Sequence, residues 1–509
     1  MKPHHSSRRR VLLRGGGLLL LLVAAVTGRA LALPPSPGHP LPATLALGPT
    51  VADVLLDAPA HRLVVGPDRD GLIYTIDLPS GTLAPTVPLR STAPVLPPQP
   101  WDGPPPLGHL LLVDALAGGI VAADPRAPRR LSAFTPAAGV RRRSPPGPGA
   151  AFGSPFAVGP WLALATRTAR LFVLTRDTSG GLIDVRDART LRLLRTVPLE
   201  PRWPPATGFG LDGAIVPLLV DDAAARVVVS HIGRPFVSVL AAATGRPLAT
   251  VVIAPPPSGG VYTVPALTLD PRTHLVFVST GNGGGGVVTT LDARSGRVLR
   301  VVPIAGNPSP PLLLPRTQRV MLATLTGLTV LDARSGRLVR TVPTTPPGLR
   351  NLVTDDQDRV LAAVDGTGRA VTLYDPTSGR PLRTLQIGDT VGTLAVDARH
   401  GRLLVVTASP FDAPRHAFTG PALLRVLDLR SGRALGAYPL GVGFHAQLVL
   451  DPRADRLAAL LDGGAGPAAP DPWAWLPAAA RRRLPFLPPP PPGTTLLPAS
   501  ATIFDTARL

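Results

Sequence analysis

The sequence has no cysteine, a single lysine (Lys2) and a single glutamate (Glu200) among 509 residues, and aromatic residues make up only 4% of it. Without cysteine the chain has no disulfide bond, no thiolate nucleophile and no site for a thioether-linked lipid. Removal of the N-terminal segment that carries Lys2 would exclude Schiff-base chemistry as well. General acid–base catalysis would therefore fall to aspartate or histidine.

Helix-period stretches are also scarce, whereas proline and glycine occur 65 and 52 times. These turn residues separate short runs of aliphatic and β-branched residues, a pattern typical of β-strands. The sequence therefore predicts an all-β protein that is stabilised by buried apolar strands.

The heptapeptide LDARSGR occurs twice, at 291–297 and at 331–337. Between its flanking aliphatic runs, the aspartate is expected to accept N–H groups across a turn and the glycine to take a positive φ, so Asp332 and Gly336 are interpreted as structural. Looser copies begin at Ile76, Arg186, Leu240, Tyr374 and Leu427. Neighbouring copies are about 40 to 55 residues apart, a period typical of four-stranded propeller blades.

A second repeat, L-x-x-D-x-x-x-x-R followed by an aliphatic run, lies upstream of the first. It occurs as Leu56-Asp57…Arg62, Val220-Asp221…Arg226, Val396-Asp397…Arg402 and Leu450-Asp451…Arg456, and in a related copy Asp270 leads to Leu275 in place of the arginine. It too predicts strand, tight turn and strand. One unit thus has four strands, A to D, and because it cannot bury both faces alone, several units must stack in a ring.

The repeats predict a β-propeller with eight blades as the best count and a range of seven to nine. The highest count makes residues 91–154 a blade, and the alternative makes them an irregular insertion. Ala43–Gly48 resembles a D strand without a blade, and Ala501–Asp505 resembles a C strand without its D strand. We therefore expect the N-terminal strand to complete the last blade and close the ring, which removes an exposed sheet edge.

Residues 1–32 have the three regions of a secretory signal peptide. Arg8–Arg10 precede the apolar run Leu18–Val26, and Ala30–Ala32 offers a cleavage site. An uncleaved anchor is the alternative, and the arginines also resemble a twin-arginine export signal. The expectation is an exported protein of the periplasm, the cell surface or the extracellular space, with no membrane span after cleavage.

After this signal, a Pro-rich lead (33–42) is followed by a single propeller domain (43–509) with irregular insertions at 91–154 and 463–500. The whole chain carries a net charge of +20, and six of its 52 bases and none of its 32 acids lie in residues 1–32. The remaining excess of arginine suggests an anionic polymer as a partner. The alternative is that the charge is compositional, because these arginines are spread around the repeats.

Together, V-x-V-L-D-x-x-S/T-G-x-x-x-x-T-V-P and the second repeat resemble the YVTN-type, or YncE-like, propellers, which are often exported bacterial proteins. The similarity covers about residues 43–90 and 155–509, and it implies the propeller fold but no assigned chemistry. The sequence departs from the family in strand B, where VVVS (227–230) and VFVST (276–280) replace Y-V-x-N. Lactonase-like propellers are similar at the level of the fold only. The tryptophan repeat of PQQ-dependent propellers is absent, so no cofactor is expected.

In such blades the B–C and D–A connections emerge on one face, and the A–B and C–D turns on the other. The long segments 91–154, 201–211, 408–421 and 463–500 are all B–C or D–A connections, so their face is the expected binding face. Candidate ligand-binding residues there are His231, Arg234, Asp365, Arg369, His416 and His445. No catalytic residue and no metal site is assigned. The histidines of the A–B turns, His61, His274 and His400, are interpreted as surface turn residues.

The sequence favours an exported, non-catalytic binding or scaffolding module whose partner is an unknown protein, a polysaccharide or a small molecule. The alternative is a lactonase-like, metal-dependent hydrolase, with aspartate and histidine holding the metal over the central channel.

Overall fold

Residues 42–507 form one compact unit of the computed structural model. The described residues are 43–47, 53–66, 72–89, 111–114, 116, 119–124, 127–135, 139–143, 161–177, 180–199, 218–231, 236–253, 266–281, 285–355, 357–412, 417–418, 420–443, 446–461, 465–467, 494–496 and 499–509. The predicted signal peptide and the Pro-rich lead lie outside them.

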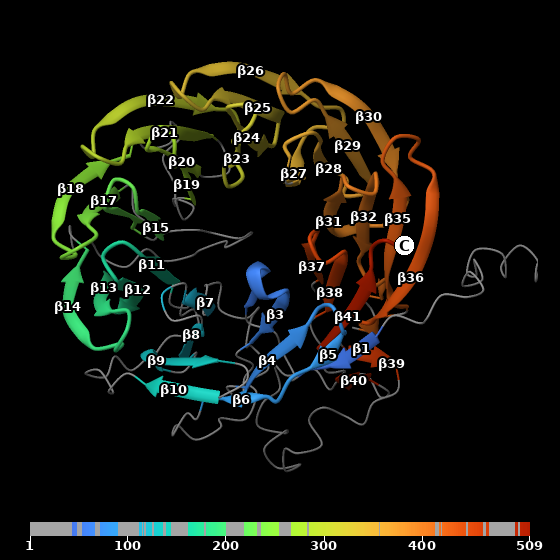
Figure 1. The fold of residues 1–509 in the computed structure, drawn as a ribbon. Helices are drawn as coiled ribbons and strands as arrows, with labels where there is room; N and C mark the ends of the chain where they lie inside the picture. The colour runs from blue at the N-terminus through green and yellow to red at the C-terminus, as the bar shows by residue number, and fades with distance from the viewer. Residues whose placement is uncertain are drawn as a thin grey trace, which may run out of the picture. The chain divides into compact units, whose positions relative to one another are not determined.

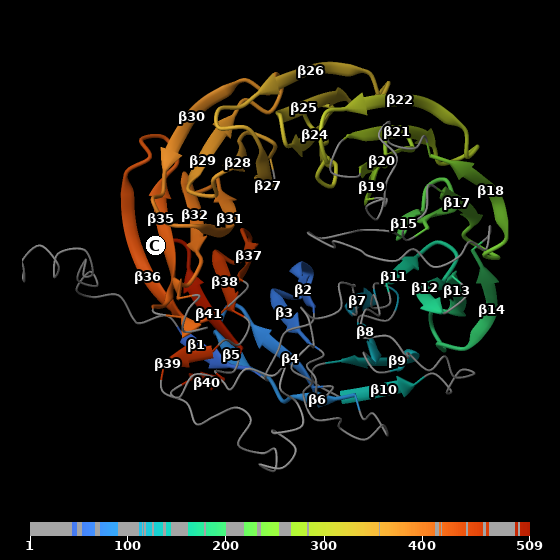
Figure 2. The ribbon, with the colours of Figure 1, turned by 180° about the vertical axis from the view of Figure 1, so that it is seen from behind.

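The described strands form nine sheets of the blade type, arranged as a propeller ring (Figures 1 and 2). Each sheet is antiparallel, and strand A is innermost while strand D lies at the perimeter. Blade 1 has β2 (Val54–Asp57), β3 (Arg62–Val65), β4 (Leu72–Asp77) and an outer strand divided into β5 (Thr82–Leu83) and β6 (Val87–Pro88), and blade 2 has β7 (Leu111–Asp114), β8 (Gly119–Asp124), β9 (Ala127–Thr135) and β10 (Gly139–Arg143). Blade 3 has β11 (Trp161–Ala165), β12 (Arg170–Asp177), β13 (Gly180–Asp187) and β14 (Leu193–Pro198), and blade 4 has β15 (Leu218–Asp221), β16 (Arg226–Ser230), β17 (Phe236–Ala241) and β18 (Pro247–Val252).

Blades 5 to 9 repeat this order, and the last blade takes its outer strand from the start of the chain. Blade 5 has β19 (Ala266–Asp270), β20 (Leu275–Gly281), β21 (Gly286–Asp292) and β22 (Val298–Ile304), and blade 6 has β23 (Leu312–Leu314), β24 (Arg319–Thr324), β25 (Gly327–Asp332) and β26 (Leu338–Pro343). Blade 7 has β27 (Leu349–Thr354), β28 (Leu361–Asp365), β29 (Ala370–Tyr374) and β30 (Pro381–Gln386), and blade 8 has β31 (Val391–Asp397), β32 (Arg402–Thr407), β35 (Ala422–Asp428) and β36 (Ala434–Gly441). Blade 9 has β37 (Ala446–Asp451), β38 (Arg456–Leu461), β41 (Ser500–Asp505) and β1 (Ala43–Ala46).

The all-β propeller is thus confirmed, and nine blades is the upper end of the range given by the sequence. The best count of eight omitted blade 2, whose four strands lie inside the segment 91–154. Neither repeat motif is present in this blade, although its strands β7 and β8 pair antiparallel as Leu111↔Ala122 through Asp114↔Gly119. A count of repeat motifs therefore missed this blade.

The ring closes as the sequence predicts. Strand β1 pairs antiparallel with β41, from Ala43↔Ile503 to Ala46↔Ser500. Leu47, which follows β1, is 6% exposed and packs in a cluster with Leu63 and Ile76 of blade 1. The N-terminal strand therefore completes blade 9 and also contributes to the core at the junction of the last and first blades.

Outer strands carry proline where a sheet edge tolerates it. The recurring Val-Pro of the first repeat stands at the end of β6, β14 and β26 and near the end of β22, where the prolines are exposed and the valines before them are buried. Because proline donates no N–H, it fits a strand only at an edge, where it also discourages pairing with another chain.

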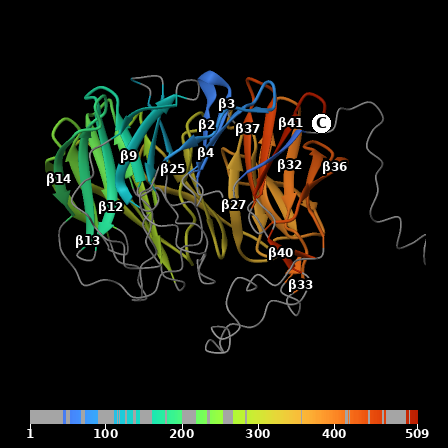
Figure 3. The same ribbon diagram turned by 90° about the horizontal axis from the view of Figure 1, so that it is seen from below.

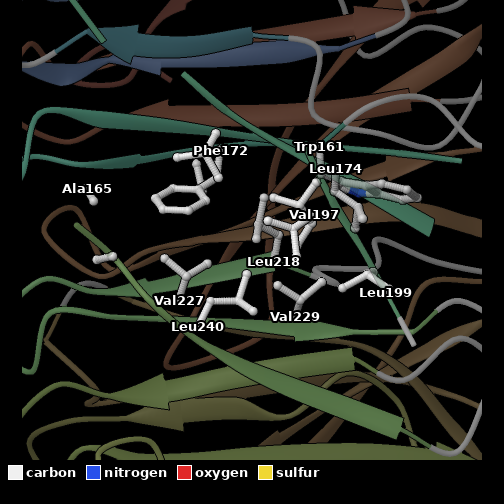
Figure 4. Packing of buried hydrophobic residues seen from close by; sticks show 14 residues of the cluster. Trp161, Ala165, Phe172, Leu174, Val197, Leu199, Leu218, Val227, Val229 and Leu240 are labelled. Carbon is white, nitrogen blue, oxygen red and sulfur yellow. The ribbon is translucent and has the colours of Figure 1, made fainter. Parts of the chain in front are cut away.

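Blades pack through apolar layers between their sheets. Figure 4 shows the layer between blades 3 and 4, where Trp161 and Phe172 meet Leu218, Val227 and Leu240. All five side chains are at most 5% exposed. Burying each one stabilises the fold by roughly 1.5–3 kcal/mol, so the ring is held by its inter-blade layers.

Candidate functional site

In four blades, an arginine at the start of strand B, the position where the second repeat has its arginine, connects the blade to the next one. Its guanidinium donates to a carbonyl oxygen of the C–D turn in the following blade. The contacts are Arg170 Nε to Ala243 O (3.2 Å), Arg226 Nε to Arg294 O (3.4 Å), Arg319 Nε to Thr377 O (3.2 Å) and Arg456 Nε to Leu78 O (3.0 Å). We call these four residues the clamp arginines.

Two histidines of the A–B turns are also inter-blade contacts. His61 Nδ1 of blade 1 lies 2.8 Å from Asp451 Oδ2 of blade 9, and His274 Nδ1 of blade 5 lies 2.6 Å from Asp221 Oδ2 of blade 4. The interpretation as surface turn residues is wrong for His274, which is 6% exposed. It failed because the aspartate that ends strand A lies beside the turn of the neighbouring blade.

The third histidine, His400, contacts its own blade through Nδ1, 2.8 Å from Asp397 Oδ2, and its Nε2 lies 3.8 Å from Asp455 Oδ1 of blade 9. The same A–B turn reaches blade 9 through Arg399, whose guanidinium lies 2.7 Å from Asp455 Oδ1. The A–B turns thus join successive blades near the inner side of one face.

The C–D turns use their aspartates as the repeat predicts. In blade 6, Asp332 Oδ1 accepts the N–H groups of Arg334 and Ser335, and Gly336 has φ of 67°. In blade 7, the hydroxyl and then the backbone N–H of Ser378 lower the pKa of Asp375 below its usual value of 3.8. Asp375 is therefore ionised at neutral pH and, like Asp332, holds its own hairpin.

On the opposite face, the candidate residue His231 lies in the B–C connection of blade 4. It is 4% exposed, and its Nε2 is 2.8 Å from Ser238 Oγ, which in turn is 3.1 Å from Thr250 Oγ1. These contacts orient the imidazole inside the blade, so His231 presents little surface to a ligand.

Asp365 and Arg369 share the B–C connection of blade 7. Both carboxylate oxygens of Asp365 accept the hydroxyl of Thr367 at 2.9 Å, and Oδ1 also accepts the N–H groups of Arg369 (3.1 Å) and Ala370 (3.2 Å). Asp365 therefore forms the hairpin, whereas the side chain of Arg369 is exposed. Arg369 is thus available to a ligand.

These residues are not gathered into one cluster: His231 belongs to blade 4, three blades from Asp365 and Arg369. The other candidates, Arg234, His416 and His445, lie outside the described residues. Within the part of the chain that is described, no three histidine, aspartate or glutamate side chains are close enough together to share a metal ion.

Two B–C connections carry additional hairpins. Strand β33 (Phe411–Asp412) pairs with β34 (Ala417–Phe418) in blade 8, and β39 (Ala465–Pro467) pairs with β40 (Thr494–Leu496) in blade 9. β34 and β39 contact each other. Figure 3 shows β33 and β40 at the same side of the ring, opposite the A–B turn between β2 and β3.

The chain is therefore a nine-bladed β-propeller with one face of short turns that connect its blades and another that carries added hairpins. No family model matches it, and no curated protein does. Among solved structures, it is similar to BamB from Moraxella catarrhalis, with 14% identity, a TM-score of 0.47, and coverage of 72% of this chain and 96% of that one. It is also similar to the dihydro-heme d1 dehydrogenase NirN in complex with DHE, with 13% identity, a TM-score of 0.49, and coverage of 83% and 84%. Both neighbours are β-propellers, and likeness at this level says nothing about function.

Sequence reasoning missed the clamp arginines and the inter-blade histidines as contacts between blades. The sequence did carry a sign of these contacts: arginine recurs at the first position of strand B, although a buried strand does not need a charged residue there. No helix among the described residues is long and apolar enough for a membrane span.

Proposed function

We propose that this protein is an exported, non-catalytic β-propeller that binds its partner on the face of the B–C and D–A connections. The partner is a protein, a polysaccharide or a small molecule. On this proposal the protein belongs with the YVTN-type propellers, to which its repeats are similar, and acts in the periplasm, at the cell surface or outside the cell.

The observation that carries the proposal is the difference between the two faces. The hairpins β33–β34 and β39–β40 extend two B–C connections on one side of the ring, and each forms a two-stranded sheet separate from the four-stranded blade sheets. On the other side, the clamp arginines and the A–B turns are engaged in holding blades together. Elaborated connections on a rigid scaffold are where binding residues usually lie.

Export is supported by the three regions of residues 1–32, from the arginines through the apolar run to Ala30–Ala32. The absence of cysteine is compatible with either redox compartment, so it does not bear on this part of the proposal.

Native mass spectrometry of the full chain, expressed in an exporting bacterium and purified from the exported fraction without chelator, tests the proposal. We expect a polypeptide mass that begins at Leu33 and a non-covalent organic or protein ligand that Arg369→Gln weakens. A stoichiometric metal ion together with esterase or lactonase turnover would overturn it in favour of the hydrolase. Retention of residues 1–32 in the cytosol would overturn the export part.

A further inference from the structure

A second set of arginines stands at the C–D turns, directly after the turn glycine or its equivalent. These turn arginines are Arg192, Arg246, Arg297, Arg337, Arg380 and Arg433, one in each of blades 3 to 8. All six are exposed. Unlike the clamp arginines, none of their guanidinium groups makes a hydrogen bond or an ion pair with a residue that the structure describes.

The carboxylates of the turn aspartates accept hydrogen bonds from other groups of the turn and not from these guanidinium groups. Asp428, for example, accepts the N–H and the hydroxyl of Ser431, and Asp375 accepts the same two groups of Ser378. Four of the six turns carry a further arginine, namely Arg189, Arg294, Arg334 and Arg430. Ten arginines therefore face five aspartates on six turns, and the rim they form has an excess of positive charge.

The arrangement of the turns follows from the ring. The outer strands β14, β18, β22, β26, β30 and β36 succeed one another along the perimeter (Figure 1). They run in the same direction in every blade, so the turns that precede them lie on the same face. The turn arginines thus form an arc from blade 3 to blade 8, whereas in blade 1 Thr82 takes the arginine position.

An exposed aliphatic residue accompanies each turn arginine, two positions further along the outer strand. These residues are Leu194, Leu248, Leu299, Val339, Leu382 and Leu435, between 38% and 64% exposed. They lie about 7 Å along the strand from the arginine. Each of blades 3 to 8 thus presents one exposed guanidinium group and one exposed aliphatic side chain on the perimeter.

We propose that this arc binds a linear acidic polysaccharide, carboxylated or sulfated, that runs along the rim from blade 3 to blade 8. The guanidinium fork matches carboxylate and sulfate oxygens in bidentate geometry. Regular repetition matches the regular charges of a polymer, and several weak contacts add up through effective concentration. The aliphatic residues offer apolar surface to the C–H faces of the sugar rings.

Two other polyanionic partners fit this rim less well. Single-stranded nucleic acid is bound on aromatic platforms, and the one aromatic residue of these six outer strands, Tyr438, packs edge-on against Phe504 at 5.6 Å. A lipid bilayer requires apolar side chains that reach deeper than the charged ones. Here the arginine closes the turn, where its carbonyl accepts the N–H of the turn aspartate or its equivalent, and the aliphatic residue follows on the strand, further from the turn.

The test compares two triple variants of the full chain that lose the same charge. The turn variant is Arg297→Gln, Arg337→Gln and Arg380→Gln; the control is Arg167→Gln, Arg316→Gln and Arg453→Gln, three exposed arginines of A–B turns. Affinities for fluorescent heparin and for polygalacturonate are measured against salt concentration, with neutral dextran as the blank. The two polymers separate the sulfated source from the carboxylated one.

We expect the turn variant to lose at least tenfold in affinity for one of these polymers and about 2 to 3 in the slope of log K against log salt. The control should stay within twofold in affinity. The turn variant should melt at the temperature of the parent, and the control at most slightly lower, because Arg167 gives up an exposed contact of 3.5 Å with Ala223 O of blade 4. Leu299→Ser with Leu382→Ser should weaken binding severalfold without changing the salt slope. Equal losses in the two triple variants would show that net charge alone is responsible and would overturn the proposal. Tighter, turn-dependent binding to duplex DNA or to phosphatidylglycerol vesicles would overturn the polymer class.

Discussion

His61 Nδ1 lies 2.8 Å from Asp451 Oδ2, and this contact joins residues 390 positions apart across the junction of the first and last blades. The corresponding pair His274 and Asp221 joins blades 5 and 4 at 2.6 Å. The two pairs differ in burial: the side chain of His61 is 36% exposed and that of His274 is 8% exposed. Similar contacts therefore stabilise two inter-blade junctions in different surroundings.

We expect His274→Asn to cost more stability than His61→Asn. In His274→Asn the buried carboxylate of Asp221 loses its imidazole partner, which costs about 2 kcal/mol of stability. In His61→Asn water can take the place of the partially exposed imidazole, so the cost is below about 1 kcal/mol. Asparagine tolerates the positive φ of both histidines, 49° and 61°. Urea unfolding of the two variants measures the difference, and equal costs would contradict the burial argument.

Arg456→Leu should destabilise the ring by about 1–2 kcal/mol, because it removes the donors to Leu78 O and Pro79 O of blade 1. Leucine already stands at the equivalent position of blade 5, at Leu275, so the substitution is compatible with the strand. The matched control is Arg297→Gln, an exposed turn arginine, which we expect to change stability by less than about 0.5 kcal/mol. Thermal unfolding followed by circular dichroism compares them.

Deletion of residues 1–47 should expose the edge of β41 and remove Leu47 from the core. We expect lower thermal stability and concentration-dependent association, since an unpaired edge is a template for strand addition. A synthetic peptide of residues 42–50 should restore both the melting temperature and the monomer. Sedimentation of the deleted chain with and without the peptide gives the result, and an unchanged deletion variant would show that β1 does not close the ring.

Gly336 is expected to tolerate alanine worse than Gly401 does, although both have φ near 67°, namely 67° and 66°. At Gly336 a Cβ would lie 2.3 Å from Thr290 Oγ1 in the preceding blade, whereas at Gly401 nothing lies within 4 Å. Gly401→Ala should cost about 1 kcal/mol of backbone strain, and Gly336→Ala at least about twice that. Denaturant midpoints of the two variants test the role of the turn glycine in inter-blade packing.

Asp358→Asn should stabilise the protein at neutral pH. Burial is the largest cause that raises the pKa of Asp358 above its usual value of 3.8, and the nearby carboxylate of Asp355 raises it further. The N–H of Arg316 acts in the opposite direction but does not cancel them. The folded state therefore holds this proton more tightly than the unfolded chain, so the favourable contribution of Asp358 is present below about pH 4 and is lost as pH rises through the folded pKa. Asparagine can still accept the N–H of Arg316, now 2.7 Å from Asp358 Oδ2.

The advantage of Asp358→Asn should accordingly shrink as the pH is lowered toward 4, which unfolding midpoints across a pH series would reveal. The turn carboxylate Asp375 has the opposite sign, because its lowered pKa gives stability above the unfolded pKa that is lost as pH falls. Asp375→Asn should therefore destabilise the protein at neutral pH and lose this effect in acid. A constant difference over the whole pH range would contradict either assignment.

The repeats by themselves determined the four-stranded blade, the hairpin roles of Asp332 and Gly336, and the completion of the last blade by Ala43–Ala46. The blade and the hairpin roles are local features, since turn chemistry and strand alternation act within a few residues. The closure could be predicted because one chain end has a D strand without a blade and the other has a C strand without its D strand. The number of blades needed the structure, because blade 2 has strand-forming residues without either motif.

Only the tertiary structure decided what the repeated charged residues do. Whether an arginine after a turn is a clamp, as Arg456 is, or remains exposed, as Arg297 does, depends on which carbonyl groups the neighbouring blade brings within reach. The same holds for His274, whose partner Asp221 is 53 residues away in sequence and 2.6 Å away in space. Sequence spacing carries information along the chain, whereas these contacts are made across the ring between units that the spacing treats as identical.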